Sequence, residues 1–196
     1  MISVAVTWAV NDVSLYTDGF AKYDVPTATG IQIQDLELIA NQLRDYFNGT
    51  TEPLNVTGPV FGKEMPLFNQ REISHMRDVK RLIWGTYGML AASGLYLIGA
   101  FTVCIMAHRQ SIWAWAIRNS LLGAGLTILV VLLISLFSLT GFDSTFRTFH
   151  EIVFPNDLWQ LDPTADRLIM MFPQSFWFDS AMFVGLVTVV EALAIG

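Results

Sequence analysis

The sequence predicts an all-α membrane helix bundle of about four transmembrane helices, the first apparently incomplete here, with an extracytoplasmic cap of mixed structure. Hydrophobic residues make up 53% of the chain and charged residues only 14%, whereas soluble domains normally carry about a quarter charged residues. Two long apolar runs, 82–106 and 112–140, can each cross a hydrocarbon core of about 30 Å. Polar stretches separate the apolar runs, and they supply the predicted cap.

The N-terminal part of the chain is predicted to belong mostly to the cap. Residues 1–10 are apolar but have about half the length of a membrane span, so we interpret them as the end of a possible first transmembrane helix. Residues 11–81 form the first extracytoplasmic region. Within it, residues 34–47 place apolar side chains at helical spacing, which predicts an amphipathic helix ended by Asn48-Gly49. Residues 50–66 predict a loop or short strands.

The two long apolar runs predict a membrane hairpin. Residues 82–106 are interpreted as one transmembrane helix and residues 112–140 as the next. The link between them, 107–111, is so short that the two helices must be antiparallel neighbours. Small residues in the first helix predict a face that packs closely against another helix. These residues are Gly85, Gly88, Gly94 and Gly99.

Positive charge at the hairpin link predicts the orientation of the chain in the membrane. His108, Arg109 and Arg118 lie at this end, which is therefore expected to be cytoplasmic. Residues 141–175 are then a second extracytoplasmic region, and residues 176–196 are a last transmembrane helix. The sequence predicts a multi-pass protein of the plasma membrane whose main polar regions are extracytoplasmic.

Two histidines occupy matching places in the hairpin and are the predicted catalytic residues. His75 comes just before the first apolar run, in a helix that Ser74 is expected to cap, and His150 comes just after the second. A hairpin brings both histidines to the same side of the bilayer. Because imidazoles titrate near neutral pH, this pair suggests proton transfer on a lipid-like substrate. We expect both histidines to line one cavity at the membrane boundary.

Acidic residues around His75 are predicted to support it. Asp78 shares a helical face with His75, and Glu72 lies on the approach side. A carboxylate beside an imidazole can fix its tautomer and raise its basicity. We expect Asp78 to orient an imidazole or to pair with Arg81 or Arg147. The alternative interpretation of these charges is a solvated collar at the end of a membrane helix.

His150 is predicted to lie in a short helix begun by Asp143 or Ser144. Arg147 is one turn earlier on the same face, and Asp157 follows as a further supporting residue. Aromatic neighbours would keep water away from His150, so it is the better candidate for the base. The alternative is an interfacial anchor whose histidine points at lipid headgroups.

Composition and motifs argue against several classes of function. The net charge is −6 and no tract of Lys or Arg exists, so nucleic acid is not expected as a partner. No pair with the spacing His-x-x-x-His supports a metal site, and no histidine lies inside an apolar run where it could hold a haem. No Gly-x-Ser-x-Gly elbow is present. The sequence therefore predicts neither a metal nor a cofactor.

Two segments carry a resemblance to a known family. The first reads Phe68-Asn-x-Arg-Glu-x-Ser-His-Met-x-Asp-Val-Lys80. The second reads Phe149-His-x-x-x-Phe-x-Asn-Asp-x-Trp-x-Leu-Asp-Pro163, continued by Asp166-x-Leu-Ile-x-Met-Phe-Pro173. They resemble the outer motifs of a bacterial integral membrane family that includes the lipoprotein intramolecular transacylases. The resemblance implies four membrane helices with an outward-facing cap, and two catalytic histidines that match His75 and His150.

The resemblance also implies a reaction and its partners. An acyl chain would move from the glyceryl group of a diacylated lipoprotein to the amine of its N-terminal cysteine, among membrane lipids. One imidazole would take a proton, and the other imidazole, Arg147 or a backbone amide would stabilise the oxyanion. Two alternatives remain open. One is a related lipid hydrolase that uses the same histidines, and the other is a non-enzymatic subunit bound to protein partners in a larger membrane complex.

Overall fold

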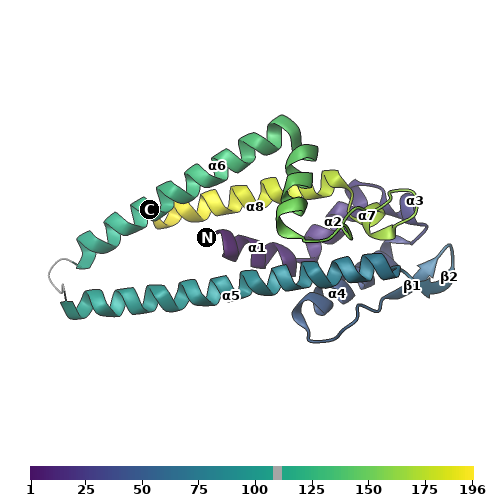
Figure 1. The fold of residues 1–196 in the computed structure, drawn as a ribbon, viewed down its shortest axis with the longest axis horizontal. Helices are drawn as coiled ribbons and strands as arrows, with labels where there is room; N and C mark the ends of the chain where they lie inside the picture. The colour runs from purple at the N-terminus through teal and green to yellow at the C-terminus, as the bar shows by residue number, and fades with distance from the viewer. Residues whose placement is uncertain (108–111) are drawn as a thin grey trace.

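A computed structural model describes residues 1–107 and 112–196. The molecule is elongated (Figure 1). Short helices and one β-hairpin form a cap at one end, and long helices extend from this cap toward the other end. His108 and Arg109, on which the predicted cytoplasmic link partly rests, lie outside the described residues. Within the described residues the chain is mostly helical, as the sequence predicts.

Three described helices are long and apolar enough to cross a membrane: α5 (Gln70–Ala107), α6 (Ile112–Val153) and α8 (Gln174–Ile195). Helix α6 packs along α8. The ten-residue helix α1 (Ile2–Asn11) is apolar as well and contacts both α5 and α8. These contacts assemble the predicted bundle of membrane helices.

The predicted contact face on α5 is wrong. A side chain added at Gly85, Gly88, Gly94 or Gly99 would meet no other atom within 4 Å. Helix α5 touches the bundle through α1, at its cap end, and stands apart from α6 over most of its length (Figure 1). The small residues of α5 therefore do not serve helix packing within the described part of the chain.

The cap is built around one hydrophobic core. Helices α2 (Val13–Lys22), α3 (Val25–Thr29), α4 (Ile33–Asn48) and α7 (Arg167–Met171) surround it. The amphipathic helix predicted over 34–47 is confirmed as α4, which buries a single apolar face before Gly49. The buried residues include Leu36, Ile39, Ala40, Leu43 and Phe47.

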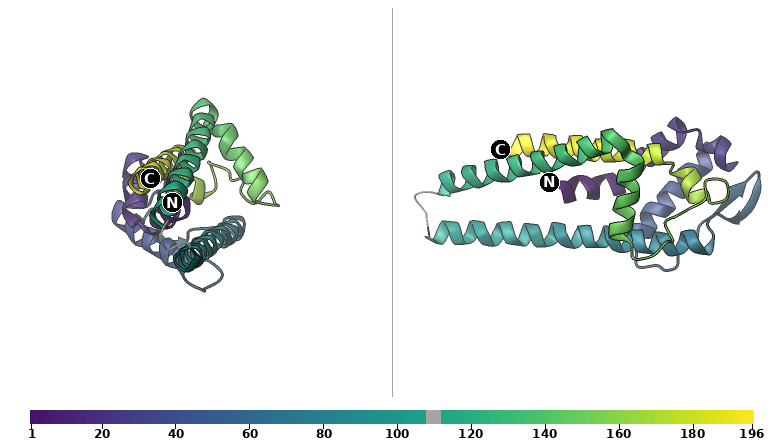
Figure 2. Two further views of the ribbon diagram at one scale, coloured as in Figure 1. Left: turned by 90° about the vertical axis from the view of Figure 1, so that its left-hand side faces the viewer. Right: turned by 45° about the horizontal axis from the view of Figure 1, so that its top comes forward.

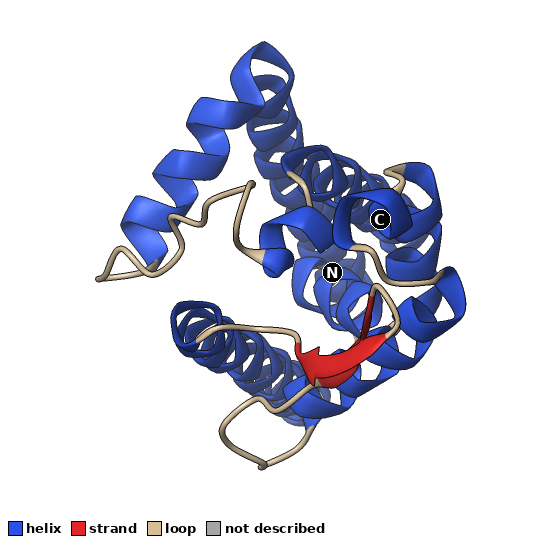
Figure 3. Ribbon diagram, turned by 90° about the vertical axis from the view of Figure 1, so that its right-hand side faces the viewer, coloured by secondary structure: helices blue, strands red, loops and turns tan. Residues whose placement is uncertain are grey.

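The short strands predicted in residues 50–66 form an antiparallel hairpin, β1 (Thr57–Val60) and β2 (Lys63–Pro66). Its two-residue turn is Phe61-Gly62, and both residues have positive φ. A two-residue turn with positive φ at both positions matches the right-handed twist of the paired strands. Figure 3 views the cap end of the molecule, with the hairpin in red beside the helices.

Helix α6 contains a sharp break that shapes the site. Gly141 has φ 178° and ψ 77°, so the helix stops and resumes in a new direction. The hydroxyls of Ser144 and Thr145 donate to the Gly141 carbonyl, 2.8 and 3.2 Å away, at the start of the resumed helix. The predicted start at Asp143 or Ser144 is therefore slightly late. Beyond the break, residues 142–153 cross from the side of α8 toward α5 (Figure 2).

Candidate functional site

The break in α6 brings His150 next to His75 of α5. The centroids of the two imidazole rings are 6.1 Å apart, and each side chain is only 7% exposed. The rings therefore lie well within one helix diameter of each other. Residues separated by a complete membrane hairpin thus meet in one buried cluster, as the hairpin argument predicts.

The His150 ring is held in a defined tautomer. Its Nδ1 lies 2.7 Å from the backbone carbonyl oxygen of Phe146. A carbonyl oxygen only accepts, so Nδ1 must carry the proton and donate it. The other nitrogen, Nε2, then keeps its lone pair and is free to accept a proton from a substrate.

Aromatic rings enclose the two imidazoles. Phe146, Phe149 and Trp159 contact His150, with ring centroids 4.2, 5.2 and 5.1 Å away. Phe154 lies against both histidines, 5.4 Å from His150 and 5.2 Å from His75. The cage buries both imidazoles, and burial disfavours the charged form of each ring.

Burial changes the acid–base behaviour of both histidines. They stand on the cap-side extensions of α5 and α6, outside the apolar runs 82–106 and 112–140. Burial lowers the pKa of His75 to about 4; the neighbouring His150 adds to the lowering and Asp78 opposes it. Burial also lowers the pKa of His150, although its hydrogen bond to the Phe146 carbonyl works the other way. The Nδ1 atom of His75 is buried and has no hydrogen-bond partner among the described residues.

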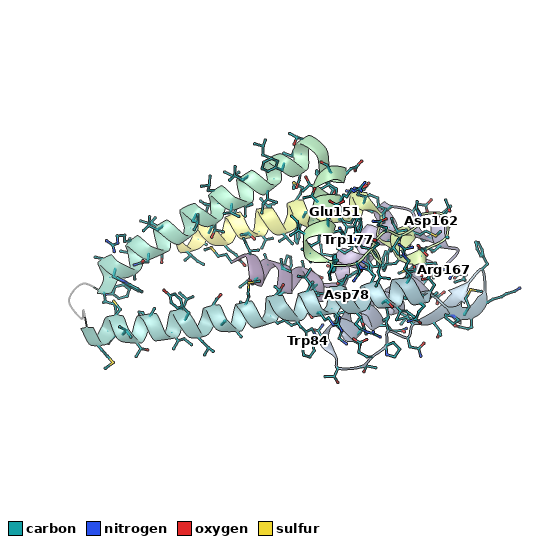
Figure 4. All side chains as sticks on the ribbon, viewed as in Figure 1. Asp78, Trp84, Glu151, Asp162, Arg167 and Trp177 are labelled. Carbon is teal, nitrogen blue, oxygen red and sulfur yellow. The ribbon has the colours of Figure 1, made fainter. Side chains whose placement is uncertain are left out.

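Asp78 supports the cluster by tying two chain segments together. One carboxylate oxygen accepts from Nη1 of Arg81 at 3.1 Å, which is one of the two predicted pairings. The other accepts from Nδ2 of Asn156 at 2.9 Å, in the loop that follows α6. Figure 4 labels Asp78 on α5 and Glu151 on α6 at the same end of the molecule. Asp78 thus holds the second motif against the helix that carries His75.

Glu72 has a different place from the one predicted. It is 1% exposed, and its two carboxylate oxygens each accept a backbone N–H at 2.7 Å, one from Asn69 and one from Leu168. Burial raises the pKa of Glu72, and the two backbone hydrogen bonds oppose that rise. Glu72 therefore joins the start of α5 to the start of α7 and has no direct contact with either imidazole.

Asn69 caps α5, and the cap predicted at Ser74 is wrong. The side-chain oxygen of Asn69 accepts the backbone N–H groups of Arg71 and Glu72 at 2.9 and 3.1 Å. Ser74 lies inside the helix and donates to the carbonyl of Gln70. Together, Asn69 and Glu72 make the reciprocal pattern of a capping box, a signal that the segment Asn69-Gln-Arg-Glu72 already carries.

Asp166 completes this junction of motifs, and the sequence interpretation gave it no role. It is 8% exposed and accepts from Nδ2 of Asn69 at 2.6 Å and from the backbone N–H of Asp162 at 2.8 Å. The carboxylates of Glu72 and Asp166 therefore lock both outer motifs to the N-terminus of α5.

Arg147 and Asp157 do not reach the imidazoles as supporting residues. Arg147 pairs with Glu151 at 2.8 Å, and both side chains are exposed. The backbone carbonyl of Asp157 accepts from Nη2 of Arg71 at 2.7 Å, and its side chain accepts from Gln160. The predicted pairing of Arg147 with Asp78 is therefore replaced by a pair within α6.

A cavity of about 410 Å³ lies beside the histidine pair. Its walls include Arg147, Asn156 and Asp157, together with Phe154 and Trp159 from the aromatic cage. Neither histidine lines this cavity, so a cavity shared by both imidazoles stays a prediction. Two rings that contact His150 form the boundary between this space and the buried pair. Among residues 1–107 and 112–196, no three His, Cys, Asp or Glu side chains gather as a metal site requires.

The chain is similar to known proteins in both sequence and structure. The family model described as "Lipoprotein intramolecular transacylase Lit" matches residues 1–177. An uncharacterized protein of Aquifex aeolicus (strain VF5) is 29% identical over 127 residues, which cover 62% of this chain. The match covers 51% of that relative, so the chain spans about half the length of the curated relative it matches.

Two solved structures have the same fold. The lipoprotein intramolecular transacylase Lit from Bacillus cereus gives a TM-score of 0.80 at 18% identity, covering 99% of this chain and 84% of that one. A variant of the same protein with a histidine-to-alanine mutation gives a TM-score of 0.73 at 20% identity, covering 99% and 82%. The Bacillus protein is membrane-integral by its description, which agrees with the three apolar helices here. The chain belongs to the lipoprotein intramolecular transacylase (Lit) family.

Proposed function

We propose that this protein transfers an acyl chain within a diacylated lipoprotein, from the glyceryl group to the amine of the N-terminal cysteine. Family membership supports the reaction class. One observation carries the assignment of the site: two buried imidazoles with ring centroids 6.1 Å apart, one of them held with a free Nε2. A single substrate supplies both amine and ester, so the site needs to provide orientation and proton transfer.

The proposed chemistry requires no water and no external acceptor. The cysteine amine attacks the carbonyl carbon of the ester, and Nε2 of His150 takes a proton from the amine nitrogen. The tetrahedral intermediate then expels the glyceryl oxygen, which receives that proton as the C–O bond breaks. An amide has formed, an ester has been lost, and the lipoprotein leaves in its lyso form. His75 holds or polarises the carbonyl oxygen during the attack.

The low exposure of the site favours transfer over hydrolysis. Phe146, Phe154 and Trp159 surround His150 and limit the access of water to Nε2. A hydrolase with the same histidines would need a water molecule to occupy the position of the amine. Because the amine and ester belong to one molecule, an enclosed site gives the amine the advantage.

We also propose that the cap and both histidines are extracytoplasmic in the plasma membrane. The apolar helices α5, α6 and α8 support a membrane location. Lipoproteins carry their acylated cysteine at the membrane surface, and the histidine cluster lies where the apolar runs of α5 and α6 end. Membrane lipids would surround the exposed apolar side chains of these helices.

Mass spectrometry of lipoproteins tests the proposal directly. A bacterial host that makes diacylated lipoproteins should form N-acylated lyso-lipoproteins only when it expresses this protein. His75→Ala and His150→Ala should each lower product formation about 10²- to 10⁴-fold, the usual cost of losing a positioned proton-transfer group. His108→Ala, a histidine at the opposite end by sequence, is the matched control and should be nearly silent. Free fatty acid with a free cysteine amine would instead indicate a hydrolase, and no product at all would favour a non-enzymatic subunit.

A further inference from the structure

A second cavity lies on the opposite face of α5 from the histidines. It has a volume of about 450 Å³ and is formed between the loop that follows α4 and the helix face with Arg77, Lys80 and Arg81. Arg77, Arg81 and Trp84 are spaced four and three residues apart, so they share this face. Figure 4 shows Trp84 on the side of α5 that points away from α6 and α8. The cavity is therefore separate from the proposed catalytic site.

Positive charge is in excess around this cavity. Three cationic side chains line it against one carboxylate, that of Glu52. Lys80 already compensates Glu52: its Nζ lies 3.4 Å from that carboxylate, donates to the Thr51 carbonyl at 2.9 Å and sits 4.1 Å from the centroid of the Tyr46 ring. Although burial alone would raise it, the hydrogen bond from Tyr46 and the nearby cations hold the pKa of Glu52 below its usual value.

The two arginines keep unused hydrogen-bond donors. Within the described residues, Arg77 contacts Glu52 at 3.4 Å through Nε, and Arg81 contacts Asp78 at 3.1 Å through Nη1. Their side chains are 40% and 73% exposed. Each guanidinium has five N–H donors in a planar fork that matches the oxygens of a phosphate. Most of these donors remain available to a ligand.

The cavity lies at the level of lipid headgroups. Arg81 is the last charged residue before the uncharged run 82–106 of α5, so the hydrocarbon core begins within about one turn of it. Trp84 is 46% exposed and donates from Nε1 to the Phe47 carbonyl at 2.8 Å. An indole with its polar edge satisfied and its ring exposed is typical of the membrane interface. A ligand in this cavity would therefore be a molecule of the interface.

We propose that this cavity binds the phosphate of an anionic phospholipid headgroup, with Arg77 and Arg81 as the phosphate ligands and Trp84 against the upper acyl chain or glycerol. The net positive lining selects an anionic headgroup over a zwitterionic one. A bound lipid would fix the height of α5 in the bilayer. The assignment depends on neither histidine and stands apart from the proposed transacylase reaction.

Lipid titration of the purified full-length protein in a neutral detergent tests this site. Native mass spectrometry would count bound phosphatidylglycerol, phosphatidylcholine and inorganic phosphate in separate titrations. We expect one phosphatidylglycerol to be retained at concentrations where the other two are not. Arg77→Gln/Arg81→Gln should weaken this binding by on the order of 10- to 30-fold, since each basic residue near an anionic membrane surface contributes about a factor of five.

A matched variant separates the cavity from the overall charge of the cap. Arg44→Gln/Lys63→Gln removes the same two charges from the cap outside the cavity and should bind phosphatidylglycerol as the wild type does. Thr50→Asp places a carboxylate on the loop wall of the cavity without altering α5, and it should also weaken binding of phosphatidylglycerol. This variant tests the site even if the arginine variant fails to fold. Equal losses in the cavity and control variants would overturn the proposal. Equal binding of phosphatidylcholine, or of inorganic phosphate alone, would overturn it as well.

Discussion

At the scale of single residues, the site depends on which nitrogen of an imidazole holds a proton. The Phe146 carbonyl lies one helical turn before His150 and fixes the proton on Nδ1. Because Nδ1 donates to this carbonyl, Nε2 is left as the basic atom of the ring. Among the described residues the buried Nδ1 of His75 has no such partner, so no hydrogen bond there fixes the tautomer of His75. The two histidines are therefore chemically distinct although they are neighbours.

The lowered pKa of His75 predicts how stability changes with pH. The pKa of His75 is about 4 in the folded state and about 6.5 in the unfolded state. Between pH 4 and 6.5, His75 is therefore protonated in the unfolded chain but neutral in the folded chain. Stability should therefore fall as pH is lowered from 6.5 toward 4. We expect His75→Gln to lose less stability than the wild type between pH 6.5 and 5, where few carboxylates titrate. Thermal unfolding in detergent measures both curves, and parallel curves would contradict the assignment.

At the scale of elements, the site is assembled by two helix ends. The capping box of Asn69 and Glu72 starts α5 one turn before His75, and the break at Gly141 redirects α6 so that His150 reaches α5. The Glu72 carboxylate also accepts the backbone N–H of Leu168 in the first turn of α7. Local backbone chemistry at these ends therefore sets the geometry of the imidazoles.

Glu72 offers a test of this junction. Glu72→Gln keeps one acceptor oxygen and so loses one of two buried backbone hydrogen bonds, which should cost about 1–3 kcal/mol of unfolding free energy. Glu72→Ala loses both and should cost more. The control is Glu151→Gln, which removes an exposed ion pair and should change stability by about 0–1 kcal/mol. Similar melting temperatures for the Glu72 and Glu151 variants would remove Glu72 from this role.

The break in α6 predicts different outcomes for two substitutions at Gly141. Its φ of 178° is extended backbone that any residue adopts, and an added Cβ would meet only the Ser144 hydroxyl, 3.2 Å away. Gly141→Ala should therefore keep nearly full activity. Gly141→Pro forces φ to about −65° and should move His150 away from His75, with loss of lyso-lipoprotein formation. An active Gly141→Pro would show that the break is not needed, and an inactive Gly141→Ala would show that this position does not tolerate a side chain.

At the scale of the whole molecule, the arrangement of membrane and cap predicts accessibility. In a Cys104→Ala background, Lys63→Cys on the cap hairpin should react with a membrane-impermeant maleimide while the plasma membrane is intact. Arg118→Cys, at the far end of α6, should react only after permeabilisation. The reverse pattern would place the histidines in the cytoplasm and exclude a substrate on the outer surface.

Local patterns in the sequence predicted most elements of the fold. The face of α4, the strands after it and the apolar runs all follow from periodicity or length over short windows, so each was recognisable without knowledge of its neighbours. The two histidines came together because a hairpin constrains both ends. The resemblance to the family pointed to the same pair.

Long-range packing could not be predicted from the same patterns. The hydrogen bond from Leu168 to Glu72 joins residues 96 apart in the chain, and no local signal indicates it. The glycines of α5 resemble a packing face, but α5 is held by α1 and leaves them open. Arg147 shares a helical face with His150, but its guanidinium forms an ion pair with Glu151 instead of contacting an imidazole. Tertiary structure decided the first two cases, whereas the Arg147–Glu151 pair is a local contact within α6.

The most direct test of the central claim, that His75 and His150 form one catalytic site, is a double-mutant cycle on acyl transfer. The rate would be measured with the purified protein and a synthetic diacylated lipopeptide for His75→Ala, His150→Ala and the double variant. Residues that act as a unit are strongly non-additive, so the double variant should be no slower than the slower single variant. Losses that multiply in the double variant would show two independent sites, and full activity in that variant would contradict the catalytic role of both histidines.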